Sequence, residues 1–524
     1  MVHLTRPVTH VFRLLRWGRV LARHGALRGL ENDRNAPPPV RRLLRYARLG
    51  TVQPSLPDYA GAFQAVGPAA IKLGQTLATR PDLVGEQAAR NLLSLQDSLP
   101  PVPFPLIEAE IAASFGKPIS SMFVSIDPVA VGSASVAQVH KAVTTDGRSV
   151  AVKVLRPGIR ERFARDLDTY EWAAAQLEGL GGEAARLRPR AVIANFKRWT
   201  LRELDLRREA ASASELADAM ASFAKFRVPA VDWDRTTGSV MTIDWIDGTK
   251  ISDIAALKGA GHDLSDLASR LVLAFLTQAI SAGFFHADMH QGNLFVESDG
   301  TIVAIDFGIM GRIDRRARVW LAEILYGLTT GNYRRVAEIH FEAQYVPAHH
   351  SVDEFATALR AVGEPMRGKP VSELSVGAML DGLFAITRDF DMAVQPHLLL
   401  LQKTMVMVEG LATSLNPGIN MWDISSPFVT RWIRDELGPE SVLADRARKD
   451  IETIMRLPEL VRRIEDQFPA RGGAPQEAPL PQVELVWDRR RNGWGWARYL
   501  AAMLAGGALV WMGMQWGLMR GIMG

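Results

Sequence analysis

The chain has 524 residues, of which 48% are hydrophobic and 23% are charged, and its net charge is +4. Because a single hydrophobic core rarely grows beyond about 250 to 300 residues, we expect at least two structural units. The apolar share excludes a largely disordered chain, and the absence of cysteine excludes disulfides, thiolate metal sites and thiol nucleophiles. The modest positive charge requires no nucleic acid, and we predict none as a partner.

The first 34 residues predict a basic amphipathic helix. Apolar residues such as Leu14 and Leu15 lie among arginines such as Arg13 and Arg16. This pattern is typical of a helix that lies on an anionic membrane surface, and equally of a solvated helix that packs on its own protein. Both interpretations stay open on the sequence.

The middle of the chain predicts a β-rich lobe followed by a helical lobe. Residues 35–125 predict helices, which prolines interrupt between Pro100 and Pro105. Residues 126–250 contain short β-branched segments bounded by turn residues, which are Ser149–Leu155, Val228–Val231 and Ser239–Ile246. Residues 251–470 predict helices, interrupted by one hairpin at Ser298–Gly300. We therefore expect an α+β fold with two lobes.

The C-terminal region predicts a membrane anchor. Residues 471–498 combine a Gly- and Pro-containing linker with a polybasic segment. The uncharged stretch Tyr499–Met519 is long enough, at about 1.5 Å per residue, to cross a hydrocarbon core of about 30 Å. A buried C-terminal helix is the alternative. Arginines that precede this stretch outnumber Arg520 beyond it, which predicts that the bulk of the chain lies in the cytoplasm.

The strongest chemical signal is the segment HADMHQGN followed by AIDFG. Asp288 and Asn293 have the spacing of a kinase catalytic loop, in which the Asp orients the hydroxyl that is phosphorylated and the Asn holds a metal ion. Asp306 opens a D-F-G sequence, where a carboxylate binds Mg²⁺ that bridges the phosphates. The order of these motifs, with a hairpin between them, predicts a kinase-like site.

His286 and His290 have the spacing of a zinc-binding pair on a helix, which is the competing interpretation of the same segment. The general-base glutamate of H-E-x-x-H is missing, and Asp288 lies between the two histidines on a predicted loop. We therefore interpret His286 as a packing residue of the catalytic loop.

Lys153 is the candidate for the lysine that pairs the α- and β-phosphates in kinases. It lies in the segment SVAVKVL, which matches the V-A-I-K strand motif. A lysine in a strand usually faces solvent, but Val152 and Val154 on either side favour a functional position. A kinase lysine needs a glutamate partner on a helix, and Glu209 is the best candidate.

The predicted phosphate loop is poor in glycine. Where a kinase has G-x-G-x-x-G, this chain has VGSASVAQVH, with a single glycine. We expect backbone amides of this loop to face the nucleotide, while the side chains limit how closely the loop covers the phosphates. The candidate nucleotide-binding residues are Gly132, Ser133, Ala134, Ser135 and Val136.

With these motifs in place, the chain resembles the UbiB family of atypical kinases, also called aarF-domain kinases, over about Tyr59–Asp435. KLGQ, with Lys72 and Gln75, resembles the K-x-G-Q motif of the family, and ELD, with Glu203 and Asp205, resembles its E-x-D motif. SASVAQVH resembles its Ala-rich loop. The resemblance implies a helical extension that covers the substrate-peptide region, with Lys72 paired to Glu203 or Asp205 in a regulatory role.

The resemblance also implies the function. It predicts a kinase or ATPase that uses ATP and Mg²⁺ and supports ubiquinone biosynthesis at the inner membrane of a bacterial cell, with membrane lipid and prenylated quinone precursors as partners, and possible contact with other enzymes of that pathway. Two alternatives stay open. One is a pseudokinase scaffold that binds nucleotide and lipid, and the other is a protein kinase, which the absence of an A-P-E sequence after Asp306 disfavours.

Overall fold

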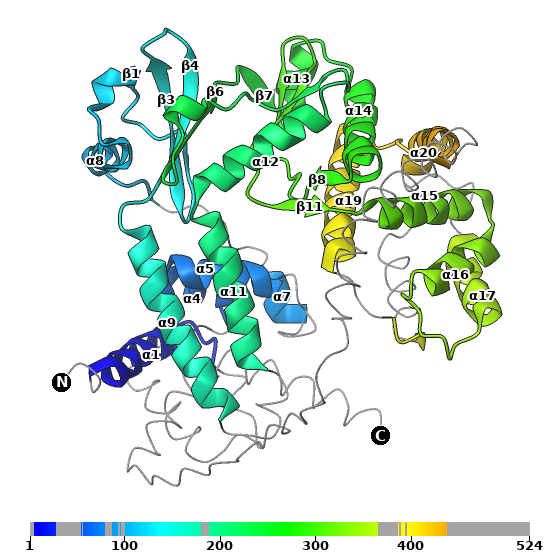
Figure 1. Ribbon diagram of the computed structural model, residues 1–524, viewed down its shortest axis with the longest axis horizontal. Coiled ribbons are helices and arrows are strands. Elements are labelled where there is room, and N and C mark those ends of the chain that lie inside the picture. The colour runs from blue at the N-terminus through cyan, green and yellow to red at the C-terminus, as the bar shows by residue number, and fades with distance from the viewer. Residues whose placement is uncertain are drawn as a thin grey trace, which may run out of the picture. The chain divides into compact units, whose positions relative to one another are not determined.

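The computed structural model contains both helices and sheets, which confirms the predicted α+β class (Figure 1). It describes residues 5–27, 54, 56–78, 86–92, 95, 100–179, 188–364, 386, 389–392 and 396–437. The chain forms two compact units: the first takes the described residues within Met1–Ala210 and Val231–Trp245, and the second those within Ala211–Ala230 and Ile246–Trp487. The predicted anchor Tyr499–Met519 lies outside the described residues, and no helix in the described part is long and apolar enough to cross a membrane.

An antiparallel sheet forms the β-rich part of the first unit, with strand order β1-β3-β4-β6 and β2 paired to β3. The strands are β1 (Phe123–Ile126), β2 (Gly132–Ser133), β3 (Ala137–Thr144), β4 (Ser149–Leu155) and β6 (Val240–Asp244). Val150, Val152 and Val154 alternate toward one face, where Ile107 and Ile111 of α8 (Phe104–Phe115) cover them. This cover fixes Lys153 on the opposite face of β4.

The predicted strand at Val228–Val231 is wrong in position. The strand of this region, β5, spans Phe226–Arg227, and Val231 forms only an isolated bridge with Ile243. Pro229 lies inside the predicted segment, and proline has no backbone N–H with which to continue a strand ladder. The predicted strand at Ser149–Leu155 is confirmed as β4, and β6 occupies most of the predicted Ser239–Ile246.

Helices form the rest of the first unit. They are α1 (Thr5–Arg23), α4 (Tyr59–Val66), α5 (Pro68–Ala78), α7 (Glu86–Leu92), α9 (Ile159–Glu178), α11 (Pro189–Glu203) and the start of α12 (Leu206–Ala219), together with the 3₁₀ helices η1 (Ile119–Ser121) and η2 (Trp233–Arg235). The residues of α12 from Ala211 onward belong to the second unit. Helix α9 packs on α11, and α1 contacts both α4 and α9. Residues 126–250 therefore contain long helices as well as the strands that the sequence pattern predicts, because α9, α11 and α12 lie between β4 and β6.

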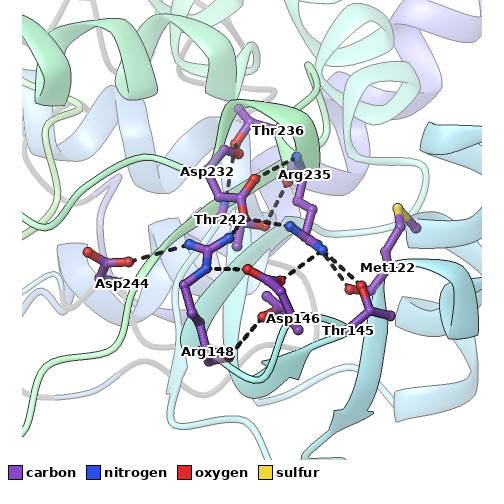
Figure 2. Close-up of polar contacts among 10 residues, drawn as sticks. Met122, Thr145, Asp146, Arg148, Asp232, Arg235, Thr236, Thr242 and Asp244 are labelled. Carbon is purple, nitrogen blue, oxygen red and sulfur yellow. Dashed lines mark hydrogen bonds and ion pairs between the residues drawn. The ribbon is translucent and has the colours of Figure 1, made fainter.

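A network of charged groups closes the end of the sheet where β3 turns into β4 (Figure 2). Arg148 pairs with Asp146 and Asp232, both at 2.6 Å. Arg235 also pairs with Asp232, at 2.8 Å, and its Nε donates to the backbone oxygen of Met122. The side chain of Asp232 is only 6% exposed, so the two arginines compensate a carboxylate that has lost most of its water. The network ties the β3–β4 turn to η2 and β1.

The second unit contains two small sheets and a set of helices. One sheet has the order β5-β10-β9-β7, and β11 pairs with β8 in the other. The strands are β7 (Gly248–Lys250), β8 (Phe284–His286), β9 (Leu294–Glu297), β10 (Ile302–Ala304) and β11 (Met310–Arg312). The helices are α13 (Ile254–Gly259), α14 (Leu264–Leu276), the π-helix η3 (Thr277–Ala282), α15 (Arg315–Thr330), α16 (Tyr333–Glu342), α17 (Val352–Gly363), α19 (Pro396–Leu415) and α20 (Met421–Leu437). The predicted hairpin at Ser298–Gly300 is confirmed, because it joins β9 to β10.

Candidate active site

Asp288 lies two residues after the end of strand β8, at the start of a loop that leads to β9. Strand β11 pairs with β8 in antiparallel register, with Met310 opposite His286. Gly311, opposite Phe285, lies so close to the aromatic ring that a Cβ atom there would overlap it. The close packing of these two short strands holds both ends of the segment that runs from Asp288 to the D-F-G sequence.

His286 braces this loop through a buried ring, which agrees with its interpretation as a packing residue and adds hydrogen bonds to it. Its Nδ1 accepts from the backbone N–H of Asp288 at 3.1 Å, and its Nε2 lies 3.0 Å from the carbonyl oxygen of Ile305. A carbonyl only accepts, so the ring proton is on Nε2. Burial lowers the pKa of His286, which favours this neutral form. Both ring nitrogens are thus engaged, which excludes the zinc-pair interpretation.

Asn293 and Asp306 lie close to the catalytic loop. The Nδ2 of Asn293 donates to the backbone oxygen of Asp288 at 3.1 Å, and the backbone N–H of Ile305 donates to the backbone oxygen of Asn293 at 2.9 Å. Since Nδ2 faces a carbonyl, the side-chain oxygen of Asn293 remains for a cation. Asp306 is exposed and has a φ of 60°, a left-handed conformation that Asp tolerates better than most residues. This set of oxygen donors fits the preference of Mg²⁺.

Lys153 and Glu209 form an ion pair in the first unit. The Nζ of Lys153 lies 2.6 Å from Oε1 of Glu209, and their side chains are 19% and 10% exposed. Lys153 comes from β4 and Glu209 from the first turn of α12, so the structure brings together the strand lysine and the helix glutamate that the sequence proposes. A mostly buried ammonium group held in this way is suited to bind phosphate oxygens.

The Ala-rich loop is a short hairpin between β2 and β3. Gly132 and Ser133 are in β2, and the backbone N–H of Ala134 donates to the oxygen of Ala137 at 2.8 Å. Ser135 is fully buried. Arg156 fastens this hairpin, because its Nε donates to the oxygen of Ala134 at 2.9 Å. The loop is therefore braced by the side chain of a residue that directly follows the end of β4.

Arg156 makes several further bonds to the same region. Its Nη2 donates to Oγ of Ser133 at 2.8 Å and to the oxygen of Pro100 at 3.0 Å, and its backbone N–H donates to the oxygen of Val136 at 2.8 Å. Burial lowers the pKa of Arg156, although a guanidinium group stays charged at neutral pH. One arginine thus joins the loop to the segment that follows α7.

The K-x-G-Q and E-x-D motifs meet in the first unit. The Nζ of Lys72 on α5 lies 3.4 Å from Oε2 of Glu203, at the end of α11. Gln75 lies on the same helix and is partly buried. A Cβ at Gly74 would overlap side chains of Leu95 and Phe63, which explains why this motif needs glycine.

Asp205 lies beyond α11 and pairs with Arg207 at 2.9 Å. Its pKa is lowered, mainly by the hydrogen bond from the Arg207 side chain. The resemblance implies that Lys72 pairs with Glu203 or Asp205. The structure shows an ion pair of Lys72 with Glu203, at 3.4 Å.

Three polar residues of these groups were missed by the sequence analysis. Arg156 braces the Ala-rich loop, and Gln278, fully buried in η3, accepts from the backbone N–H of His286 through Oε1 at 3.0 Å. Lys403 of α19 lies with its Nζ 3.1 Å from Oδ1 of Asp288. A charged residue within the apolar stretch Pro396–Leu415 is the one signal that could have drawn attention to Lys403.

The class of protein follows from these features. A protein-kinase-like fold is defined by a catalytic-loop Asp and Asn, a D-F-G carboxylate, and a strand lysine paired with a helix glutamate. Residues 94–340 match the ABC1 atypical kinase-like domain, and residues 359–420 match the UbiB helical domain. The family assignment therefore extends over both the kinase-like region and the helices that follow it.

Two curated relatives agree with this assignment. Proteins named "Probable protein kinase UbiB" from Marinobacter nauticus and from Pseudomonas fluorescens are each 38% identical, over 86% of this chain and over 84% and 83% of their own lengths. A solved structure of an Rv3197–erythromycin complex from Mycobacterium tuberculosis is 25% identical with a TM-score of 0.47, and the match covers 67% of this chain and 88% of that one. This chain belongs to the UbiB family of atypical kinases.

Proposed function

We propose that this protein is an atypical kinase or ATPase that binds Mg-ATP and supports ubiquinone biosynthesis at the inner membrane of a bacterial cell. The observation that carries the proposal is the ligand set itself. The ion-paired Lys153 with Glu209, and the loop that contains Asp288, Asn293 and Asp306, provide each polar group that phosphotransfer from ATP requires. A scaffold that had lost its chemistry would not need to keep all five.

Each residue has a distinct role in the proposed reaction. Lys153, held by Glu209, binds the α- and β-phosphates, while Asn293 and Asp306 hold Mg²⁺, which would neutralise phosphate charge. Asp288 accepts the proton of the attacking hydroxyl group or water. The new bond forms between that oxygen and the γ-phosphorus, and the bond from the γ-phosphorus to the bridging oxygen breaks, so that ADP leaves with the electron pair.

The Ala-rich loop favours a slower phosphotransfer than a Gly-rich kinase loop would allow. The side chain of Arg156 fastens the hairpin at Ser133 and Ala134, which limits the movement that a Gly-rich loop would allow over the phosphates. This favours ATP hydrolysis, or transfer to a small lipid-like acceptor, over rapid phosphorylation of proteins. Prenylated quinone precursors in the membrane are the acceptors or cargo that family membership favours, and other enzymes of the pathway are candidate partners.

The same loop favours a second candidate function. A hairpin that Arg156 fastens to the segment at Pro100 could hold a nucleotide without turning it over. The protein would then be a nucleotide- and lipid-binding scaffold that organises other enzymes. Turnover of ATP by the purified protein, in the presence of liposomes and a phenolic quinone precursor, separates the two functions, because a scaffold binds the nucleotide and releases it unchanged.

Asp306 provides the direct test of the nucleotide site. We expect Asp306→Asn to weaken Mg-ATP binding by about 10- to 100-fold, because the site loses a carboxylate that would hold Mg²⁺ and so compensate phosphate charge. Calorimetric titration with ATP, with and without Mg²⁺, measures this. The matched control is Asp218→Asn, which removes the charge of an exposed carboxylate on α12. An affinity for Mg-ATP that stays unchanged in Asp306→Asn would contradict the proposed site.

A further inference from the structure

Lys403 places a positive charge directly on the candidate catalytic carboxylate. Its Nζ lies 3.1 Å from Oδ1 of Asp288, although the two residues are 115 positions apart in the sequence. Helix α19, which carries Lys403, packs on α14, with Thr404 and Val408 fully buried, and it also contacts β11. Because β11 pairs with β8, the strand that leads into Asp288, the position of Lys403 is fixed relative to the loop.

The other neighbour of Asp288 is a weaker partner. The Nδ1 of His290 accepts from the backbone N–H of Gly292 at 3.0 Å, so the proton of the neutral ring is on Nε2. That Nε2 lies 3.6 Å from Oδ2 of Asp288, which is too long for a direct hydrogen bond. Within the described part of the chain, Lys403 is therefore the side chain that bonds this carboxylate directly.

Stability alone does not account for the pair. The side chains of Lys403 and Asp288 are 39% and 25% exposed, and an ion pair at such an exposed position contributes little to stability. An ammonium group has three N–H donors. Among the described residues only Asp288 bonds to Lys403, so two donors remain for another acceptor next to the carboxylate.

The charge of Lys403 matches the charge that the reaction must stabilise. During phosphotransfer, negative charge spreads over the oxygens of the γ-phosphoryl group, which must approach the nucleophile that Asp288 orients. A cation fixed beside Asp288 would therefore lie near those oxygens during the transfer. Stabilisation of developing charge by a preorganised donor is among the largest contributions to catalysis.

We propose that Lys403 is a phosphoryl-binding residue of the phosphotransfer centre, which holds Asp288 in position and donates hydrogen bonds to the γ-phosphoryl oxygens. This inference rests on the proposed function, in which Asp288 takes the proton of the attacking hydroxyl. The new oxygen–phosphorus bond forms as the γ-phosphorus separates from the bridging oxygen, and ADP takes the electron pair. Lys403 takes no part in the proton transfer and contributes only its positive charge.

The test compares Lys403→Met and Lys403→Arg with the parent chain. Met keeps the length of the side chain and removes the charge, whereas Arg keeps the charge. We expect Lys403→Met to lower kcat for ATP about 100-fold with a much smaller change in KM, and Lys403→Arg to recover part of that loss. Calorimetry should show that Lys403→Met weakens binding of ATP several-fold and leaves ADP binding unchanged, since ADP lacks the γ-phosphoryl group.

Lys258→Met is the matched control, because Lys258 is an exposed lysine at the end of α13. Thermal unfolding of each variant shows whether it is folded. A Lys403→Met protein with the kcat of the parent and the same ratio of ATP to ADP affinity would overturn the role of Lys403. If the parent protein binds ATP without turnover, the ratio of ATP to ADP affinity alone decides whether Lys403 binds the γ-phosphoryl group. The proposed function fails separately, when Asp306→Asn retains the Mg-ATP affinity of the parent.

Discussion

His286 connects three parts of the second unit through one buried side chain. Its ring bonds the backbone of Asp288 and of Ile305, and it packs edge-on against Phe307 with ring centroids 5.6 Å apart. The side-chain oxygen of Gln278 accepts a hydrogen bond from the backbone N–H of His286. The catalytic loop and the D-F-G segment are thus positioned by the same imidazole, so the geometry of Asp288 depends on a residue that need not touch a substrate.

We expect His286→Phe to lower both stability and turnover. Phenylalanine preserves the ring packing, but it removes the partner of the partly buried N–H of Asp288 and of the oxygen of Ile305, at a cost of at most about 1–3 kcal/mol for each group. Chemical denaturation measures the loss of unfolding free energy, and kcat for ATP should fall while ADP affinity changes little. The control is His349→Phe, at an exposed position. Full turnover in a destabilised His286→Phe protein would show that the brace is only structural.

The residues of the candidate site differ in how far the sequence could predict them. Asp288, Asn293 and Asp306 lie within one short segment, so their spacing identifies them. No spacing identifies Lys403 or Arg156, because tertiary packing sets their partners. Lys403 reaches Asp288 from a helix whose apolar pattern indicates only burial. An arginine after a strand, such as Arg156, gives no local signal that it will fasten a loop.

At the scale of elements, helices α5 and α11 bring the K-x-G-Q and E-x-D motifs together. The side chains of Lys72 and Glu203 are 17% and 30% exposed, so water screens this pair only partly. Loss of one partner should therefore cost about 1–2 kcal/mol locally, less than for a fully buried pair. The importance of the pair to function is a separate question from this small contribution to stability.

We expect Lys72→Ala to fold and to bind nucleotide, but to have altered ATP use and to fail to restore ubiquinone in a strain that lacks the native gene. An ordinary kinase needs no lysine outside its two lobes, so this outcome separates a UbiB-type mechanism from a general one. Lys117→Ala, at an exposed position after α8, is the control. If Lys72→Ala restores ubiquinone as fully as the parent while Asp306→Asn does not, the α5–α11 contact serves packing alone.

The helices between β4 and β6 show the limit of reasoning from local patterns. Helix α9 begins at Ile159, only a few residues after Leu155 ends β4. The strongly β-branched segments on either side dominate the sequence pattern, whereas α9 and α11 carry charges on most of their length and bury narrow stripes. Such helices are stabilised by packing on each other, and packing between distant segments is not visible in a single sequence.

At the scale of the whole molecule, the outward face of α1 bears on how the protein could attach to a membrane. Helix α1 buries Leu14 and Trp17 against α9. Its outer face leaves Phe12 70% exposed and Leu15 39% exposed, with Arg16 exposed beside them. Apolar side chains next to arginine on one outward face are typical of helices that bind anionic lipid. The packed and the membrane-bound interpretations of this helix are therefore compatible, because they use different faces.

We expect a chain that lacks Tyr499–Gly524 to remain partly bound to anionic vesicles through α1. In that truncated chain, Phe12→Ser with Leu15→Ser should weaken binding about tenfold or more, because each apolar side chain contributes about 1.5–3 kcal/mol when fully buried and less at an interface. Co-sedimentation with vesicles that contain anionic lipid measures this, and the bound fraction should fall as salt shortens the Debye length from about 10 Å at 0.1 M to about 3 Å at 1 M.

The control for this test is Trp199→Ser, since Trp199 is also exposed, at 58%, but lies on α11. It removes a large apolar side chain from the same unit without changing the outer face of α1. Equal loss of binding in both variants would indicate a general effect of surface apolarity. A truncated chain that stays in solution at low salt would show that α1 serves the fold alone, through Leu14 and Trp17, and that membrane attachment depends on the C-terminal segment.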